Sequence, residues 1–181
     1  MSTQASLTPI FGVTELVGDL FVDHRGSFLN AFRFQESAFY SFWGDRAISQ
    51  VNLSRTESIG VVRGLHMQAS PYSEAKLVRC IRGRVWDVAV DLRSGSTTFG
   101  EWHAVELTPS SATALLIPEG CAHGFQVLEP SSELLYLHSQ PWVPEAEAGV
   151  RFDDPQLSIP WPLEPVGLSE RDLNLPLIAS F

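Results

Sequence analysis

Lysine, cysteine and long apolar runs are scarce in this sequence. Its 181 residues carry 12 Lys and Arg against 21 Asp and Glu, so the formal net charge is −9. We therefore expect no nonspecific binding to nucleic acid or to an anionic membrane. No run approaches the roughly 18 apolar residues of a membrane-spanning helix, and no basic-then-apolar leader opens the chain. Neither membrane insertion nor standard secretion is expected.

The only two cysteines, Cys80 and Cys121, form no C-x-x-C or Cys/His metal motif. Both lie in apolar, strand-like stretches. This context favours reduced core residues of a cytoplasmic protein over a disulfide or a metal site.

Apolar and aromatic residues are abundant, with 44% hydrophobic residues, five Trp and eleven Phe. At this length they favour one globular domain spanning residues 1–181. Short stretches of apolar alternation recur between turn residues, and only Gln35–Trp43, closed by Gly44, is typical of a helix. The pattern predicts an all-β antiparallel barrel or sandwich with short peripheral helices.

Strand alternation makes sharper predictions in the middle of the chain. Leu77–Ile81 and Val85–Leu92 are expected to form a hairpin around Arg82-Gly83-Arg84. In the second arm Asp87 falls on the opposite face from Trp86. A carboxylate at that place either faces solvent or serves an interior polar site.

The stretch Gly60–Cys80 concentrates candidate functional side chains, because Arg63, His66 and Lys76 lie within fourteen positions among apolar residues. Lys76 is the only lysine of the chain, and a compact ammonium whose pKa can move suits catalysis. The alternative is a snorkelling lysine beside a core histidine with a partner. This stretch alone does not decide between the two interpretations.

Pro118–His123 has the pattern P-x-G-x-x-H, which resembles the second motif of cupins, small antiparallel barrels of the jelly-roll type. Gly60–Gly83 occupies the place of the first cupin motif. Metal-binding cupins carry H-x-H and a Glu there, whereas this chain has His66-x-Gln68 and a distant Glu74. Because transition metals need three or four well-placed ligands, we expect an interior site without a metal.

Nine motifs in sequence order give a closer resemblance over nearly the whole chain. They are D-x-R-G at 23–26, Q-x-N at 50–52, V-x-R-G-L-H-x-Q at 61–68, A-K-L-V-R at 75–79, G-x-V-x-D-V-A-V-D-x-R at 83–93, T-x-F-G-x-W at 97–102, I-P-E-G-x-A-H-G-F at 117–125, L-Y at 135–136 and L-S-x-x-D at 168–172. Together they are similar to the dTDP-4-dehydrorhamnose 3,5-epimerase family.

This resemblance implies a jelly-roll isomerase that inverts C3, C5 or both in a nucleotide-linked 4-keto-6-deoxyhexose. The best match is conversion of dTDP-4-dehydro-6-deoxy-D-glucose to dTDP-4-dehydro-L-rhamnose. Hydrogens α to a ketone are acidic enough for a positioned base to remove them, so no cofactor is implied. The family also implies a homodimer, in which Arg25 can serve a neighbour's site.

The resemblance also implies roles for individual residues. His66 matches the base, Asp172 the carboxylate that orients it, and Tyr136 the acid on the opposite face of the sugar. Lys76 matches the group that stabilises the enolate oxygen. Substrate contacts are implied for Arg25, Asn30, Gln50, Asn52, Arg63, His123 (with Asp87 as its partner), Glu147 and Arg171.

Three positions depart from the family pattern. Asn30 stands where a Glu near the nucleotide is usual, Val51 replaces an acidic residue, and Pro141-Trp142 replaces a Tyr pair. These departures leave open the nucleobase, the sugar and the centre that is inverted. Three alternatives therefore stay open: a single-centre epimerase acting on a dTDP- or CDP-linked sugar, a non-catalytic sugar-nucleotide-binding cupin, and a metal-dependent cupin enzyme.

Overall fold

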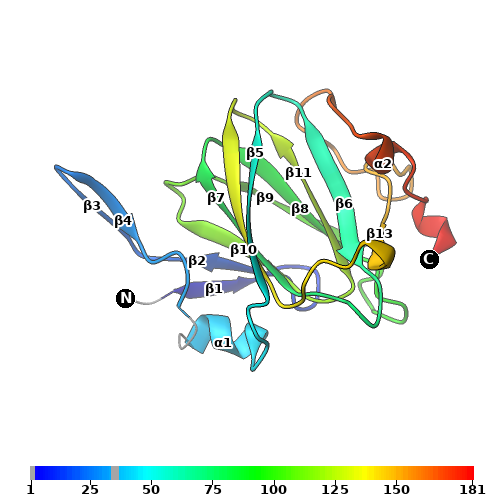
Figure 1. Ribbon diagram of the computed structural model, residues 1–181, viewed down its shortest axis with the longest axis horizontal. Helices are drawn as coiled ribbons and strands as arrows, with labels where there is room; N and C mark the ends of the chain where they lie inside the picture. Colours follow the sequence, from blue (N-terminus) through cyan, green and yellow to red (C-terminus); the bar gives the residue numbers. More distant parts are fainter. Residues whose placement is uncertain (1–2, 34–36) are drawn as a thin grey trace.

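The computed structural model describes residues 3–33 and 37–181, which form mainly antiparallel strands (Figure 1). The strands are β1 (Gln4–Leu7), β2 (Thr14–Val17), β3 (Leu20–Asp23), β4 (Gly26–Leu29), β5 (Gln50–Thr56), β6 (Val62–Gln68), β7 (Lys76–Arg82), β8 (Val85–Asp91), β9 (Trp102–Leu107), β10 (Thr113–Ile117), β11 (Cys121–Val127), β12 (Ser132–His138) and β13 (Glu147–Gly149). The helical elements are α1 (Ser37–Trp43), α2 (Glu170–Leu173) and the 3-10 turns η1 (Pro144–Ala146) and η2 (Ile178–Ser180). In the described part of the chain, no helix is long and apolar enough to cross a membrane.

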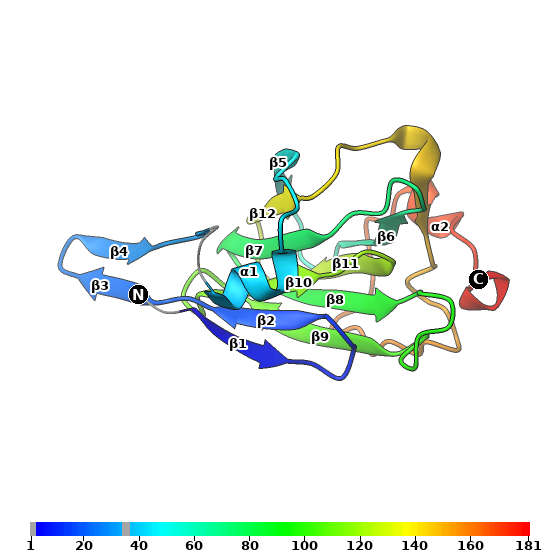
Figure 2. The same ribbon diagram turned by 90° about the horizontal axis from the view of Figure 1, so that it is seen from below.

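The strands form two main antiparallel sheets and one separate hairpin. The six-stranded sheet has the order β1-β2-β10-β7-β12-β5, and the five-stranded sheet has the order β13-β6-β11-β8-β9. The β3–β4 hairpin projects from the body of the molecule, as both ribbon views show (Figures 1 and 2). The all-β, antiparallel fold class is confirmed. Within residues 3–33 and 37–181, however, no strand pairing joins the two main sheets into a closed barrel.

The interior cluster of apolar side chains follows from strand alternation. On β8, Val85 and Ala89 belong to the interior cluster, whereas Val88 and Val90 belong to the cluster on the outer face, as the sequence predicts. Cys80 and Cys121 are buried free thiols of the interior cluster. Burial raises the pKa of these thiols to about 11 and about 12, which keeps both protonated at neutral pH.

The outer faces of both sheets are covered by other segments. Phe39 and Trp43 of α1 pack in an apolar cluster with Leu77 and Leu116 of the six-stranded sheet. The expected helix began at Gln35, which lies outside the described residues. The C-terminal part of the chain supplies Val150, Leu157, Ile159 and Ile178 to the cluster outside the five-stranded sheet. The proline-rich end therefore completes a core and carries α2 toward β6.

The expected hairpin of β7 and β8 is wrong, because these strands belong to different sheets. β7 pairs with β10 and β12, while β8 pairs with β11 and β9. Gly83, with φ of +74°, lies where the chain crosses from one sheet to the other. A short arginine–glycine turn is compatible with a hairpin and with a corner between sheets, so the local sequence could not separate them.

The pairing of β13 with β6 depends on Gly149, which lies opposite His66. A Cβ at Gly149 would overlap the backbone carbonyl of Leu65. We expect Gly149→Ala to lower the free energy of unfolding by about 3 kcal/mol, measured by urea denaturation. The control is Gly95→Ala, where the Cβ meets no atom within 4 Å and only the φ of +79° is strained. Equal losses in the two variants would contradict this account.

Candidate active site

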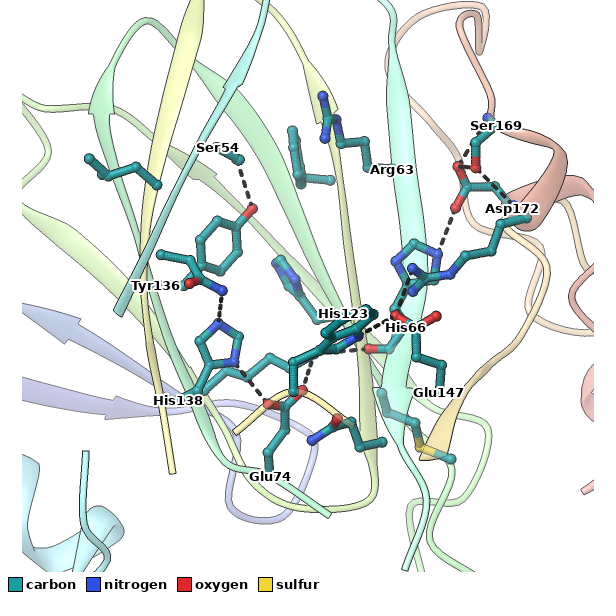
Figure 3. A pocket seen from close by; sticks show the side chains of 18 of the residues that line it. Ser54, Arg63, His66, Glu74, His123, Tyr136, His138, Glu147, Ser169 and Asp172 are labelled. Atoms are coloured by element: carbon teal, nitrogen blue, oxygen red, sulfur yellow. Dashed lines mark hydrogen bonds and ion pairs between the residues drawn. The ribbon is translucent and has the colours of Figure 1, made fainter. Parts of the chain in front are cut away.

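The two sheets enclose a cavity of about 760 Å³ (Figure 3). Its polar lining residues are Asn52, Ser54, Arg63, His66, Gln68, Glu74, Lys76, His123, Tyr136, His138, Glu147, Ser169, Arg171 and Asp172. Most of the predicted site residues are therefore brought together, although they come from six strands and from the helix near the C-terminus.

His66 on β6 and Asp172 on α2 lie in close polar contact in the cavity, with 2.6 Å between Nε2 and Oδ1. Ser169 caps α2 and fixes this carboxylate, because its backbone N–H and its hydroxyl both donate to Oδ2. The cap holds a buried carboxylate against an imidazole that remains 24% exposed to the cavity.

The surroundings of His66 and Asp172 determine the protonation state of each side chain. Burial lowers the pKa of His66, although contact with Asp172 acts in the opposite direction. Burial alone would raise the pKa of Asp172, but hydrogen bonds to His66 and Ser169 outweigh it and lower that pKa to about 2. At neutral pH the imidazole is largely neutral and the carboxylate is ionised. A neutral imidazole beside a carboxylate can accept a proton and be stabilised afterwards.

Tyr136 on β12 lies across the cavity from His66, with His123 between them in the view of Figure 3. Its hydroxyl is 3.3 Å from Oγ of Ser54. Burial raises the pKa of Tyr136, so the phenol keeps its proton until a stronger base forms nearby. A proton acceptor and a proton donor thus stand on opposite sheets.

Lys76 is buried at the start of β7. Its Nζ lies 3.0 Å from Oε1 of Glu74 and donates to the carbonyl of His66 at 3.3 Å. The other oxygen of Glu74 lies 2.9 Å from Nδ1 of His138. Burial acts to raise the pKa of Glu74, but the hydrogen bond to His138 and the charge of Lys76 outweigh it and lower that pKa. Glu74 is therefore ionised, and its two oxygens contact the ammonium of Lys76 and Nδ1 of His138.

His123 and Asp87 form a second buried histidine–carboxylate pair. Nε2 of His123 is 2.8 Å from Oδ1 of Asp87, which confirms the predicted partnership and shows that Asp87 serves an interior site instead of facing solvent. The ring of His123 meets that of Tyr136 edge to face at 5.9 Å. This pair therefore packs against the phenol.

The mouth of the cavity holds two arginines in different states. Arg171 is paired with Oε1 of Glu147 at 2.8 Å, and the indole N–H of Trp142 donates to the same oxygen. Arg63 donates only to the carbonyl of Arg55, and among the described residues it has no carboxylate partner. Arg63 is therefore a positive charge at the mouth that an anionic ligand can neutralise.

Comparison with known proteins agrees with this geometry. The family profile described as dTDP-4-dehydrorhamnose 3,5-epimerase matches residues 7–180. A curated protein of that name from Sinorhizobium fredii is 41% identical over 157 residues, covering 86% of this chain and 80% of that protein. This chain belongs to the dTDP-4-dehydrorhamnose 3,5-epimerase family.

Two solved structures extend the likeness to three dimensions. A 4-keto-6-deoxy sugar epimerase from Streptomyces spheroides has a TM-score of 0.93 and 38% identity, with 99% of this chain and 89% of that chain covered. A 3'-monoepimerase from Streptomyces bikiniensis, solved with dTDP-quinovose, has a TM-score of 0.87 and 36% identity, with 95% and 86% covered. Both structures support a cupin-type epimerase architecture.

Three residues expected from the family resemblance lie outside the cavity lining. Arg25 is at the tip of the β3–β4 hairpin, 78% exposed and paired with Asp23, and Asn30 follows β4. Gln50 lies at the rim, where its side chain accepts a hydrogen bond from the backbone N–H of Trp142. The structure therefore does not bring Arg25 and Asn30 to the site of their own chain.

His138 was not predicted from the sequence, and Glu74 was considered there only as a metal ligand. The signal for His138 was available, since it lies two residues after Tyr136 and so faces the same side of the strand. Gln68 was also considered only in that context. Its side chain binds the backbone of Pro141 and Val143 and so holds the loop beside the cavity.

The contact between His66 and Asp172 can be tested by titration. The carboxylate favours the protonated imidazole, so its removal lowers the pKa of His66 further below its ordinary value. We expect the NMR titration of the His66 ring to move to lower pH in Asp172→Asn. Asp153→Asn is the control, because Asp153 pairs with Arg151 on the surface. An unchanged or upward shift in Asp172→Asn would show that the carboxylate does not act on this ring.

Proposed function

We propose that this protein inverts C3 and C5 of a dTDP-linked 4-keto-6-deoxyhexose, with dTDP-4-dehydro-6-deoxy-D-glucose as the preferred substrate. The observation that carries the proposal is the pair of proton-transfer groups on opposite walls, His66 with Asp172 and Tyr136. The dTDP sugar in the Streptomyces bikiniensis relative and the names of the other relatives support the substrate class.

The proposed reaction moves protons only. Neutral His66 takes the hydrogen next to the C4 ketone, and the electron pair of the broken C–H bond forms an enolate. Asp172 stabilises the resulting imidazolium, and Lys76 stabilises the enolate oxygen. Tyr136 then gives its proton to the other face of the carbon, which inverts the centre. Neither a redox cofactor nor a metal is needed in this sequence of steps.

Arg63 is proposed to bind the diphosphate of the substrate. A guanidinium matches two phosphate oxygens in geometry as well as in charge. Lys76 and Arg171 are already neutralised by Glu74 and Glu147, whereas Arg63 donates only to a backbone carbonyl. Asn52 and His123 also line the cavity and are proposed to contact the sugar.

The deciding experiment incubates the wild-type protein, dialysed against EDTA, with the 4-keto sugar nucleotide in deuterated water. NMR then resolves deuterium incorporation and configuration at C3 and at C5. Incorporation with inversion supports the proposal, and inversion at one centre identifies a single-centre epimerase. Binding of the sugar nucleotide without deuterium incorporation would show that the protein is a non-catalytic sugar-nucleotide-binding protein. Activity that returns only on adding a divalent metal would overturn the metal-free chemistry.

His66→Asn tests the base. Asparagine keeps a polar side chain but cannot accept the proton, so we expect exchange to fall by at least about 10²–10⁴-fold at both carbons. His103→Asn is the control, because His103 is paired with Glu15 and is absent from the cavity lining. Near-normal exchange in His66→Asn would remove His66 from the base role.

Tyr136→Phe should separate exchange from inversion. His66 would still form the enolate, but no phenol would protonate the opposite face, so most enolate would regain a proton from His66 with retention. We expect deuterium incorporation to exceed epimer formation greatly, measured in the same NMR experiment. Tyr72→Phe, at a tyrosine 45% exposed, is the matched control. Inversion at the wild-type rate would make Tyr136 a packing residue.

A homodimer in the cytoplasm is also proposed. An isolated two-stranded hairpin is only marginally stable in water, yet β3–β4 projects with Val22 and Phe28 exposed by 72% and 60%. Packing of this hairpin against a second copy would cover these side chains and carry Arg25 to the partner's site. The buried free thiols Cys80 and Cys121 suit a reducing compartment.

Subunit mixing tests the role of Arg25. Arg25→Ala and His66→Asn homodimers should each be impaired. If Arg25 acts in the neighbouring site, a mixed dimer contains one site with both residues intact, and refolding the two variants together should restore activity. Light scattering checks that dimers form. No restoration in confirmed mixed dimers would mean that Arg25 does not complete a neighbour's site.

A further inference from the structure

His138 and Glu74 form a chain of polar contacts that ends at Lys76 (Figure 3). Nδ2 of Asn52 lies 3.4 Å from Nε2 of His138, whose Nδ1 lies 2.9 Å from Glu74. The second oxygen of Glu74 lies 3.0 Å from the ammonium of Lys76. This chain runs from β5 through β12 to the start of β7, so it spans one wall of the cavity.

The contacts define which nitrogen of His138 carries the proton. An amide nitrogen can only donate, so Nε2 of His138 accepts from Asn52. The ring proton is then on Nδ1, from which it is donated to Glu74. This hydrogen bond leaves the other oxygen of Glu74 for Lys76. Each member therefore fixes the orientation of the next.

The arrangement is largely buried, since the side chains of Glu74, Lys76 and His138 are only 8%, 9% and 12% exposed. A flexible lysine side chain can place its ammonium at several points, and a shared carboxylate restricts it to one. Because electrostatic stabilisation of an enolate needs a charge fixed before the reaction, the position of Glu74 sets that of the ammonium.

We propose that His138 is a positioning residue for the enolate step: it holds Glu74, and through Glu74 it holds Lys76. This inference rests on the proposed function. Asn52 has a part in the same chain, since its amide fixes the tautomer of His138. The ring of His138 also stacks on Tyr136 at 5.9 Å, so a competing explanation is that His138 acts through Tyr136 instead.

Two substitutions separate these routes. His138→Phe keeps an aromatic ring against Tyr136 but removes the donor to Glu74. His138→Asn loses the ring but places an amide N–H near the position of Nδ1. We expect His138→Phe to lower kcat about 10- to 100-fold with KM changed less than threefold, because a misplaced catalytic charge affects the transition state most. Exchange and inversion should fall in the same proportion, and His138→Asn should recover most of the loss.

The double variant Glu74→Gln/His138→Phe tests the route directly. If His138 acts through Glu74, the double variant should be no slower than Glu74→Gln alone. The proposal is overturned if the two losses multiply, if His138→Phe lowers inversion but not exchange, or if His138→Asn is as slow as His138→Phe. Circular dichroism and dTDP binding confirm that each variant is folded. Absence of exchange in the wild type would refute the proposed function instead.

Discussion

Burying ionisable side chains along the walls of the cavity is the constraint on which this site depends. An isolated ion inside a protein is strongly disfavoured, so each one needs a partner of opposite charge or a set of hydrogen bonds. Four carboxylates meet this need, in the pairs Asp172–His66, Glu74–Lys76, Asp87–His123 and Glu147–Arg171. Three of these pairs join different elements of the fold, whereas Glu74 and Lys76 are two residues apart at the start of β7. The pairs that keep the ions in place therefore also define the shape of the cavity.

Asp172, which lies on α2 in the C-terminal segment, is brought to His66 by the packing of that segment. The C-terminal segment would be irregular in isolation, but it covers the outer face of the five-stranded sheet with Leu157 and Ile159. This apolar packing brings α2 to β6, and the Ser169 cap then directs the carboxylate at His66. Hydrophobic packing of the C-terminal segment thus brings Asp172 near His66, and the Ser169 cap then fixes the direction of its carboxylate.

The sequence predicted the strands well because their signal is local. Alternation on β8 put Asp87 and Trp86 on opposite faces, and in the structure Asp87 is the buried, interior one of the two, whereas Trp86 packs in the outer cluster. Motif resemblance supplied the residues of the site, most of which line one cavity. The partition of β7 and β8 into separate sheets was not predictable, because it depends on pairing with β10, β11 and β12 rather than on Gly83 itself. The motif implied a ligand contact for Arg25, which stays a prediction, and it gave no sign that Arg25 lies on a projecting hairpin.

His138 illustrates why the remainder of the site escaped prediction. The position of His138, two residues after Tyr136, indicates which face of the strand it lies on. It does not indicate which residue it contacts, because its partner Glu74 lies 64 positions away in the sequence. Only the pairing of β12 with β7, which sets His138 opposite Lys76, makes the contact visible. The same pairing puts Tyr136, the proposed proton donor, and Lys76, the proposed enolate-stabilising group, on one sheet, while His66, the proposed base, stands on the other. In the proposed reaction the α-carbon of the substrate loses its proton to one sheet, and the planar enolate gains a proton from the other, so the two-sheet architecture would supply the asymmetry that inversion requires.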